Sequence, residues 1–187
     1  MKDFNRKNLY FSLCGLNCTL CSMYIGRYCP GCGKGEGNQS CSIARCSLKY
    51  NNMEYCFFCF NFPCEKYKGI EEYDSFITHQ NQLKDINRFK EIGSDAYNNE
   101  QVVKFDFLRK LLDNYNDGKR KTFYCLAINL LSIQKIEAIM KQISDNKKIE
   151  NLTIREKAEF VVLLFQEEAV KDGVILKLRR KKSNFSK

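Results

Sequence analysis

The chain has 187 residues and a formal net charge of +9, with 44% apolar and 28% charged residues. The apolar content is sufficient for a packed core, and the charged fraction is ordinary for a soluble protein. No apolar run approaches the roughly 18 residues that a membrane-spanning helix requires, so we expect no association with a membrane.

The N-terminal segment favours a cytoplasmic protein. Its start, MKDFNRKNLYFSL, contains an apolar patch shorter than a signal-peptide core, and no A-x-A-like cleavage site follows it. Disulfides are rare in a reducing cytoplasm, and an odd total of eleven cysteines fits complete pairing poorly. We therefore expect most of the cysteines to bind metal.

Ten of the eleven cysteines lie close together, which defines a Cys-rich metal-binding module over residues 1–65. They occur in four groups, CGLNCTLC, CPGC, CSIARC and CFFCFNFPC. Three pairs have two intervening residues, and such a tight turn lets both sulfurs bind one ion at about 2.3 Å. The predicted metal ligands are Cys14, Cys18, Cys21, Cys29, Cys32, Cys41, Cys46, Cys56, Cys59 and Cys64.

Zinc is the first interpretation of these ligands, with about two or more ions, because closed four-thiolate sites are the commonest use of paired Cys-x-x-Cys turns. The simplest division of the ten thiols forms one four-thiolate site from the middle of the segment and a second site from four of the six other thiols. Two thiols are then not used as ligands, unless a third site or bridging thiolates exist. The first site in this partition comprises Cys29, Cys32, Cys41 and Cys46.

A 4Fe-4S cluster is the alternative cofactor. The spacing Cys14-x3-Cys18-x2-Cys21 is that of the cluster motif in radical S-adenosylmethionine enzymes, although those enzymes generally have a far longer barrel domain. A redox dithiol at Cys56 and Cys59 is a third interpretation, but no thioredoxin-like βαβ pattern surrounds that pair.

Metal binding would also change the net charge. A zinc ion with four thiolates, or an oxidised four-iron cluster with four thiolates, carries about −2, so two sites would leave about +5. The basic composition is therefore a weak argument for nucleic-acid binding.

The segments CGLNCTLCSMYI, CPGCG, CSIARC and CFFCFNFPCEKY resemble, in order and spacing, the Cys-rich family called domain of unknown function 3795. The resemblance covers about residues 10–68. Members commonly have proline after the third cysteine, where this chain has Ser22. The resemblance implies a metal-binding module and supplies no reaction or catalytic residue.

Residues 66–187 are predicted to form a helical domain, because their apolar residues recur at three- and four-residue steps. The last helix has the clearest boundaries, with a capping box at Thr153 and Glu156 and a C-cap at Asp172-Gly173. We assign residues 174–178 to a short terminal strand. The other expected helices cover residues 65–80, 83–92, 96–115 and 122–143. The fold class is mostly α, with a small irregular Cys-rich module and a C-terminal helical bundle.

Other candidate residues have ordinary structural interpretations. Cys125 lies in an apolar helical stretch and is expected to be a small buried hydrophobe. His79 is the only histidine and is expected at a solvated helix end. The basic tail at 177–182 is expected to be a solvated terminus, with contact to nucleic acid or an acidic partner as the alternative.

The sequence therefore favours a metal-binding protein in which a zinc-stapled module serves recognition of a ligand or macromolecule. The alternative is an iron–sulfur redox or accessory protein of anaerobic metabolism. No catalytic residue can be assigned, so the sequence leaves open whether the chain is an enzyme.

Overall fold

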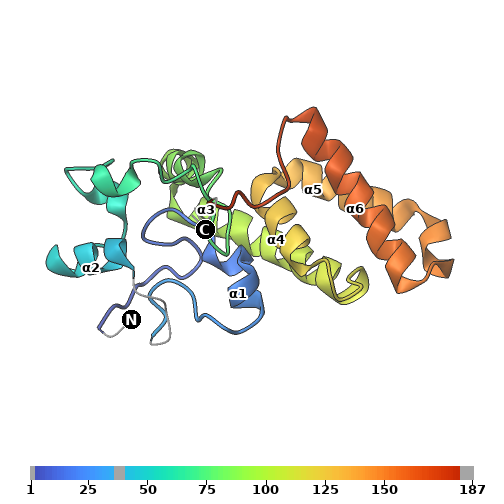
Figure 1. Cartoon of the computed structure of the whole chain (residues 1–187), viewed down its shortest axis with the longest axis horizontal. Helices are drawn as coiled ribbons and strands as arrows, with labels where there is room; N and C mark the ends of the chain where they lie inside the picture. The colour runs from blue at the N-terminus through green and yellow to red at the C-terminus, as the bar shows by residue number, and fades with distance from the viewer. Residues whose placement is uncertain (1–2, 36–40, 182–187) are drawn as a thin grey trace, which may run out of the picture.

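The fold is mostly helical, as predicted. The computed structural model describes residues 3–35 and 41–181 (Figure 1). Within these ranges it contains six α-helices and four short 3-10 helices and no β-strand; one isolated backbone bridge joins Asn5 to Lys34. The α-helices are α1 (Ser22–Ile25), α2 (Ser42–Lys49), α3 (Gln82–Asn114), α4 (Lys121–Leu130), α5 (Ile133–Asp145) and α6 (Ile154–Lys171).

The Cys-rich part of the chain is made of short helices separated by turns. It contains α2, which lies near the N-terminus at the left of Figure 1, α1, which lies near the middle of the molecule beside α4, and three single-turn 3-10 helices. These are η1 (Cys18–Leu20), η2 (Cys56–Phe58) and η3 (Glu65–Tyr67). Such short elements make few internal contacts, so other interactions must hold this part together.

The long helix α3 joins two of the predicted helices end to end. Its helical dihedrals break only at Gly93, where φ is 80° and ψ is 167°, so the helix bends there. The predicted helix over 65–80 is wrong, because η3 ends at Tyr67 and turns follow it up to α3. In these turns the buried carboxylate of Asp74 accepts hydrogen bonds from the backbone N–H groups of His79 and Arg179, at 2.7 Å each.

The predicted helix over 122–143 is divided in the structure. Leu131 and Ser132 have extended backbone dihedrals between α4 and α5, so the chain changes direction there and the two helices are separate. The last predicted helix is confirmed: Thr153 and Glu156 form the capping box of α6, and Gly173 follows α6 with a φ of 65°. The fourth 3-10 helix, η4 (Lys147–Asn151), lies between α5 and α6.

The strand predicted over 174–178 is also wrong. This segment leaves α6 and runs back toward the middle of the molecule (Figure 1), where Val174 and Leu176 pack against the main core. It ends against a turn, since Asp74 N–H donates to the carbonyl oxygen of Arg179 at 2.8 Å. One such bond is not a ladder, so no strand forms.

The Cys-rich part and the helices share their cores. Leu20 of η1 belongs to the main core, which α3, α4, α5 and α6 otherwise build. In a second cluster, Phe11 and Tyr55 pack on the first half of α3, and the ring of Phe11 stacks on Phe89 at 4.9 Å. The Cys-rich segment therefore buries Phe11 and Tyr55 against α3.

A buried polar network connects the same elements. The side-chain amide of Asn17 donates to Asp85 Oδ2 at 2.7 Å and to Asn129 Oδ1 at 3.1 Å. Tyr97 OH donates to Asn17 Oδ1 at 3.0 Å, and Lys104 Nζ donates to the Asn129 carbonyl oxygen at 3.2 Å. Asp85 and Tyr97 lie on opposite sides of the bend at Gly93, so Asn17 ties both halves of α3 to α4.

The pKa of Asp85 yields a testable pH dependence. Burial raises this pKa to about 7, although Lys104, Asn17 and Lys84 act in the opposite direction. A pKa raised by folding gives stability that is present below the unfolded value, near pH 4, and is lost as the pH rises through 7.

We predict that Asp85→Asn, which mimics the protonated acid, gains about 2 kcal/mol of stability relative to the parent protein between about pH 5 and pH 8. Urea unfolding at several pH values measures this difference, with metal content checked at each pH. Parallel stability curves for the two proteins would show that Asp85 titrates as an ordinary carboxyl.

Candidate metal centre

The two Cys-x-x-Cys pairs outside the CPGC motif form the tight turns that metal binding requires. Cys18 begins η1, and the N–H of Cys21 donates to its carbonyl oxygen at 3.1 Å. Cys56 begins η2, and the N–H of Cys59 donates to its carbonyl oxygen at 2.9 Å. One turn of 3-10 helix thus places each pair of thiols on the same side of the backbone.

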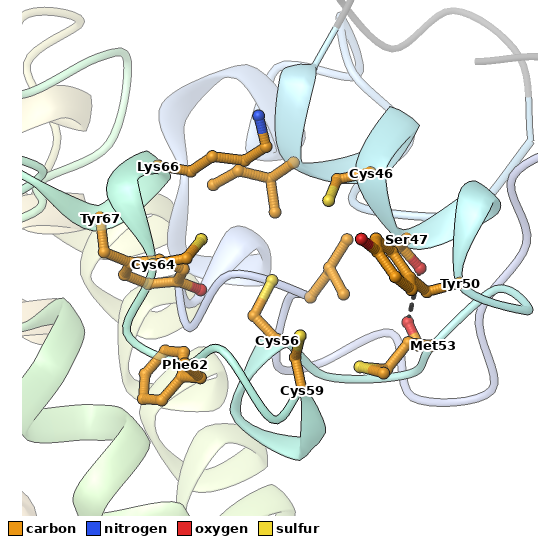
Figure 2. A pocket seen from close by; sticks show the side chains of 12 residues that line it. Cys46, Ser47, Tyr50, Met53, Cys56, Cys59, Phe62, Cys64, Lys66 and Tyr67 are labelled. Atoms are coloured by element: carbon orange, nitrogen blue, oxygen red, sulfur yellow. Dashed lines mark hydrogen bonds between the residues drawn. The ribbon is translucent and has the colours of Figure 1, made fainter.

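Four thiols line one small cavity, which Figure 2 shows from close by. Cys46 comes from α2, Cys56 and Cys59 come from the η2 turn, and Cys64 precedes η3. The apolar side chains of Leu13, Ile43 and Phe62 complete much of the wall, and the cavity volume is about 40 Å³. Residues from three separate segments of the chain therefore present sulfur to one small cavity.

A second group of five thiols is centred on Cys18. Burial raises the pKa of the Cys18 thiol well above its ordinary value, and the thiols of its neighbours raise it further through electrostatic repulsion. These neighbours are Cys32, Cys14, Cys21 and Cys29, in decreasing order of effect. Including Cys18, this second group takes its members from the CGLNCTLC and CPGC motifs.

Cys14, a member of the group around Cys18, also approaches the first group, and Cys41 lies near both groups. Burial raises the pKa of Cys14 to about 12, with repulsion from Cys32, Cys41 and Cys56, which belong to both sides. Cys41 is the only exposed cysteine of the ten. The structure therefore groups the thiols differently from the simplest partition, because Cys46 lies with Cys56, Cys59 and Cys64 instead of with Cys29 and Cys32.

Raised thiol pKa values recur through the segment. Burial raises the pKa of Cys56 to about 11, and the nearby thiols of Cys64, Cys46 and Cys41 add to the effect. Without a cation such thiols stay protonated, whereas a bound divalent metal removes the proton of each coordinating thiol. The donor set thus fits a thiophilic metal.

Polar groups also lie near several of the thiols. The backbone N–H groups of Met23 and Tyr24 oppose the rise in the pKa of Cys21, and the Tyr67 hydroxyl, which donates to the Cys14 carbonyl oxygen at 3.2 Å, opposes the rise in the pKa of Cys56. Ser12 Oγ lies 3.4 Å from Cys14 Sγ. Donors of this kind orient metal-bound sulfurs and reduce their charge.

Arg6 is a member of this site that the sequence did not indicate. Its side chain is 1% exposed, forms an ion pair with Glu54 at 3.2 Å and, as a nearby positive charge, opposes the rise in the pKa of the Cys32 thiol that burial causes. The guanidinium also donates to the carbonyl oxygen of Phe11 at 2.7 Å. A Cβ at Gly33 would lie 2.5 Å from Arg6 Cγ, so glycine at 33 permits this approach.

The thiols converge without forming a ready-made coordination polyhedron. Across residues 3–35 and 41–181, no group of three or more His, Cys, Asp or Glu side chains lies close enough to hold a metal ion as it stands. The structure also joins none of the described cysteines in a disulfide. Metal binding would therefore require side-chain adjustment within each group.

The remaining sequence candidates lie outside both groups. Cys125 is buried in α4, as predicted. His79 is half-buried in a turn before α3, with Nδ1 3.1 Å from the Ile70 carbonyl oxygen and Nε2 3.1 Å from Ser75 Oγ.

The described part of the basic tail is partly engaged within the molecule. Arg179 forms an ion pair with the buried Asp74 at 3.1 Å, and Arg180 donates to the Ser75 carbonyl oxygen at 3.0 Å. The tail's end, from residue 182, lies outside the described residues. Among the described helices, none is both long and apolar enough to cross a membrane.

Comparisons with protein-family models, with curated proteins and with solved structures give no match for this chain.

The role of Arg6 can be tested by substitution. We predict that Arg6→Met costs about 2 kcal/mol or more of stability, because Glu54 and two buried carbonyl groups lose a charged donor. Arg6→Lys keeps the charge but not the planar set of donors, so it should recover only part of this loss. Urea unfolding of the metal-loaded proteins measures both effects. If Arg6→Met were as stable as the parent protein, the hydrogen bonds and ion pair of Arg6 would not contribute to stability.

Proposed function

We propose that the Cys-rich segment is a zinc-binding module that holds about two ions and supports recognition of a ligand or macromolecule. The observation that carries this proposal is the convergence of Cys46, Cys56, Cys59 and Cys64 on one protected cavity. Four thiolates form the usual closed structural zinc site. A second site would take four of the five thiols around Cys18.

The size of the first cavity supports zinc over a cluster at that position. A volume of about 40 Å³ is enough for about three water molecules. A single ion fits this space, whereas a 4Fe-4S core adds four iron and four sulfide atoms.

The structural need for metal follows from the short elements of the module. Its helices α1 and α2 span only Ser22–Ile25 and Ser42–Lys49. Coordination supplies folding free energy directly where such elements bury little apolar surface. Thiolate sites also suit a reducing compartment, so the cytoplasmic location belongs to the same proposal. So does the resemblance to domain of unknown function 3795, which implies a metal-binding module without a known reaction.

An iron–sulfur centre is the second candidate, and a specific observation favours it at the group around Cys18. The thiols that gather there include the Cys14-x3-Cys18-x2-Cys21 motif, whose spacing is that of a cluster-binding motif. In that case the chain would be a redox or accessory protein.

Metal identity can be measured directly. Anaerobic purification of the full chain should yield a colourless protein with about two zinc ions, because each closed site holds one ion. A brown protein with stoichiometric iron and sulfide would overturn the zinc proposal in favour of the cluster. A metal-free protein that unfolds cooperatively with native stability would overturn both.

The ligand assignment can be tested on one helix. We predict that Cys46→Ser loses about one zinc ion and unfolds the surrounding turns. Cys41→Ser is the matched control, because Cys41 directly precedes the same helix but is exposed and outside the cavity. Elemental analysis and circular dichroism measure both variants. Equal metal loss in the two variants would show that the grouping is wrong.

A further inference from the structure

A basic groove lies between the Cys-rich segment and the helices. One wall comes from α1 and the turn after it, with Tyr24, Arg27 and Tyr28. The opposite wall comes from the second half of α3 and the first residue of α4, with Arg109 and Lys121. Its volume is about 1080 Å³, which is at the upper end for a small-molecule site.

The charge of the groove is strongly one-sided. Four cations line it, Arg27, Lys34, Arg109 and Lys121, against one carboxylate, Asp113. Among the described residues, no ion pair joins any of the four to a carboxylate. The cations come from separate segments around one hollow, so their fields add where an anion would lie.

Aromatic rings line the same hollow. Tyr28 is 72% exposed, and Lys121 Nζ lies 6.0 Å from its ring centroid. Tyr24 contacts Phe105 edge-on at 6.5 Å between centroids. An exposed ring beside a cation offers a stacking surface for a planar group.

The turn that carries these side chains is held in an unusual conformation. Arg27 has a φ of 60°, which residues with a side chain rarely adopt. Hydrogen bonds from the N–H groups of Arg27 and Tyr28 to the carbonyl oxygens of Tyr24 and Met23, both 2.9 Å, hold the turn. A Cβ at Gly26 would lie 2.6 Å from the Tyr28 ring, so the ring packs directly on the backbone. Strained residues of this kind are concentrated at binding sites.

We propose that this groove binds a small phosphorylated molecule with a planar ring, such as a nucleoside diphosphate. The arginines and lysines pair with phosphate oxygens. Tyr28 stacks on the ring, and Asp113 accepts hydrogen bonds from sugar hydroxyls. The proposal goes beyond the metal sites, because the groove's cations are not metal ligands.

Titration calorimetry of the metal-loaded full chain tests the proposal, with ADP, adenosine and pyrophosphate as probes. ADP should bind at least about tenfold more tightly than either fragment, because only ADP engages both the rings and the cations. No saturable binding of ADP up to about 1 mM would overturn the proposal. A single-stranded oligonucleotide that binds more tightly than ADP, and loses affinity in the same variants, would also overturn it in favour of nucleic acid.

Variants then locate the site. Arg109→Gln and Lys121→Gln should each weaken ADP binding by about tenfold. The matched controls Lys110→Gln and Lys119→Gln, whose exposed lysines do not line the groove, should leave it unchanged. Tyr28→Ala should weaken binding by a similar factor and Tyr28→Phe should not, because the ring stacks and the hydroxyl does not contribute.

Equal losses of ADP affinity in the control variants would show that ADP is attracted by the overall positive charge, and would contradict the proposed binding site. Elemental analysis of each variant keeps this outcome separate from the metal proposal. Normal zinc content without ADP binding would contradict only the proposal that the groove binds a nucleotide. Loss of zinc would show that Arg109 and Lys121 also affect the thiol groups.

Discussion

The buried side chain of Asn17 is the interaction on which the arrangement of this protein depends. It lies directly before η1 and uses both its donor and its acceptor on α3 and α4, through Asp85, Tyr97 and Asn129. A bent helix such as α3 would otherwise leave its two halves free to change their angle. The same contacts fix the position of Cys18, so the polar network and the thiol groups are parts of one arrangement.

Ionisation of the buried thiols costs free energy. Burial and mutual repulsion raise the pKa values of Cys14, Cys18 and Cys56, so ionising them together is unfavourable in the protein alone. A divalent ion reverses the balance, because each coordinated thiolate is then stabilised by the metal. Arg6 contributes a permanent positive charge beside Cys32, which offsets part of the negative charge of a four-thiolate site.

The parts of the structure that local chemistry determines could be predicted from the sequence, and the parts that depend on distant contacts could not. The capping box at Thr153 and the tight turn at Cys56 follow from neighbouring residues. The buried face of α3 contains Lys104, and an apolar pattern cannot identify a lysine whose hydrogen-bond partner, the carbonyl oxygen of Asn129, is distant in the sequence. The grouping of Cys46 with Cys64 likewise depends on how α2 folds back.

The thiol groups and the basic groove meet at the turn before Cys29. Cys29 lies in the thiol group around Cys18 and also lines the groove, and the preceding turn presents Arg27 and Tyr28. If metal holds Cys29, the free energy of metal binding also restricts the turn that binds the anion. Thermodynamic linkage then requires that ligand binding in the groove increases the affinity for the metal by the same factor. A single turn of chain would thus couple a structural ion to ligand recognition.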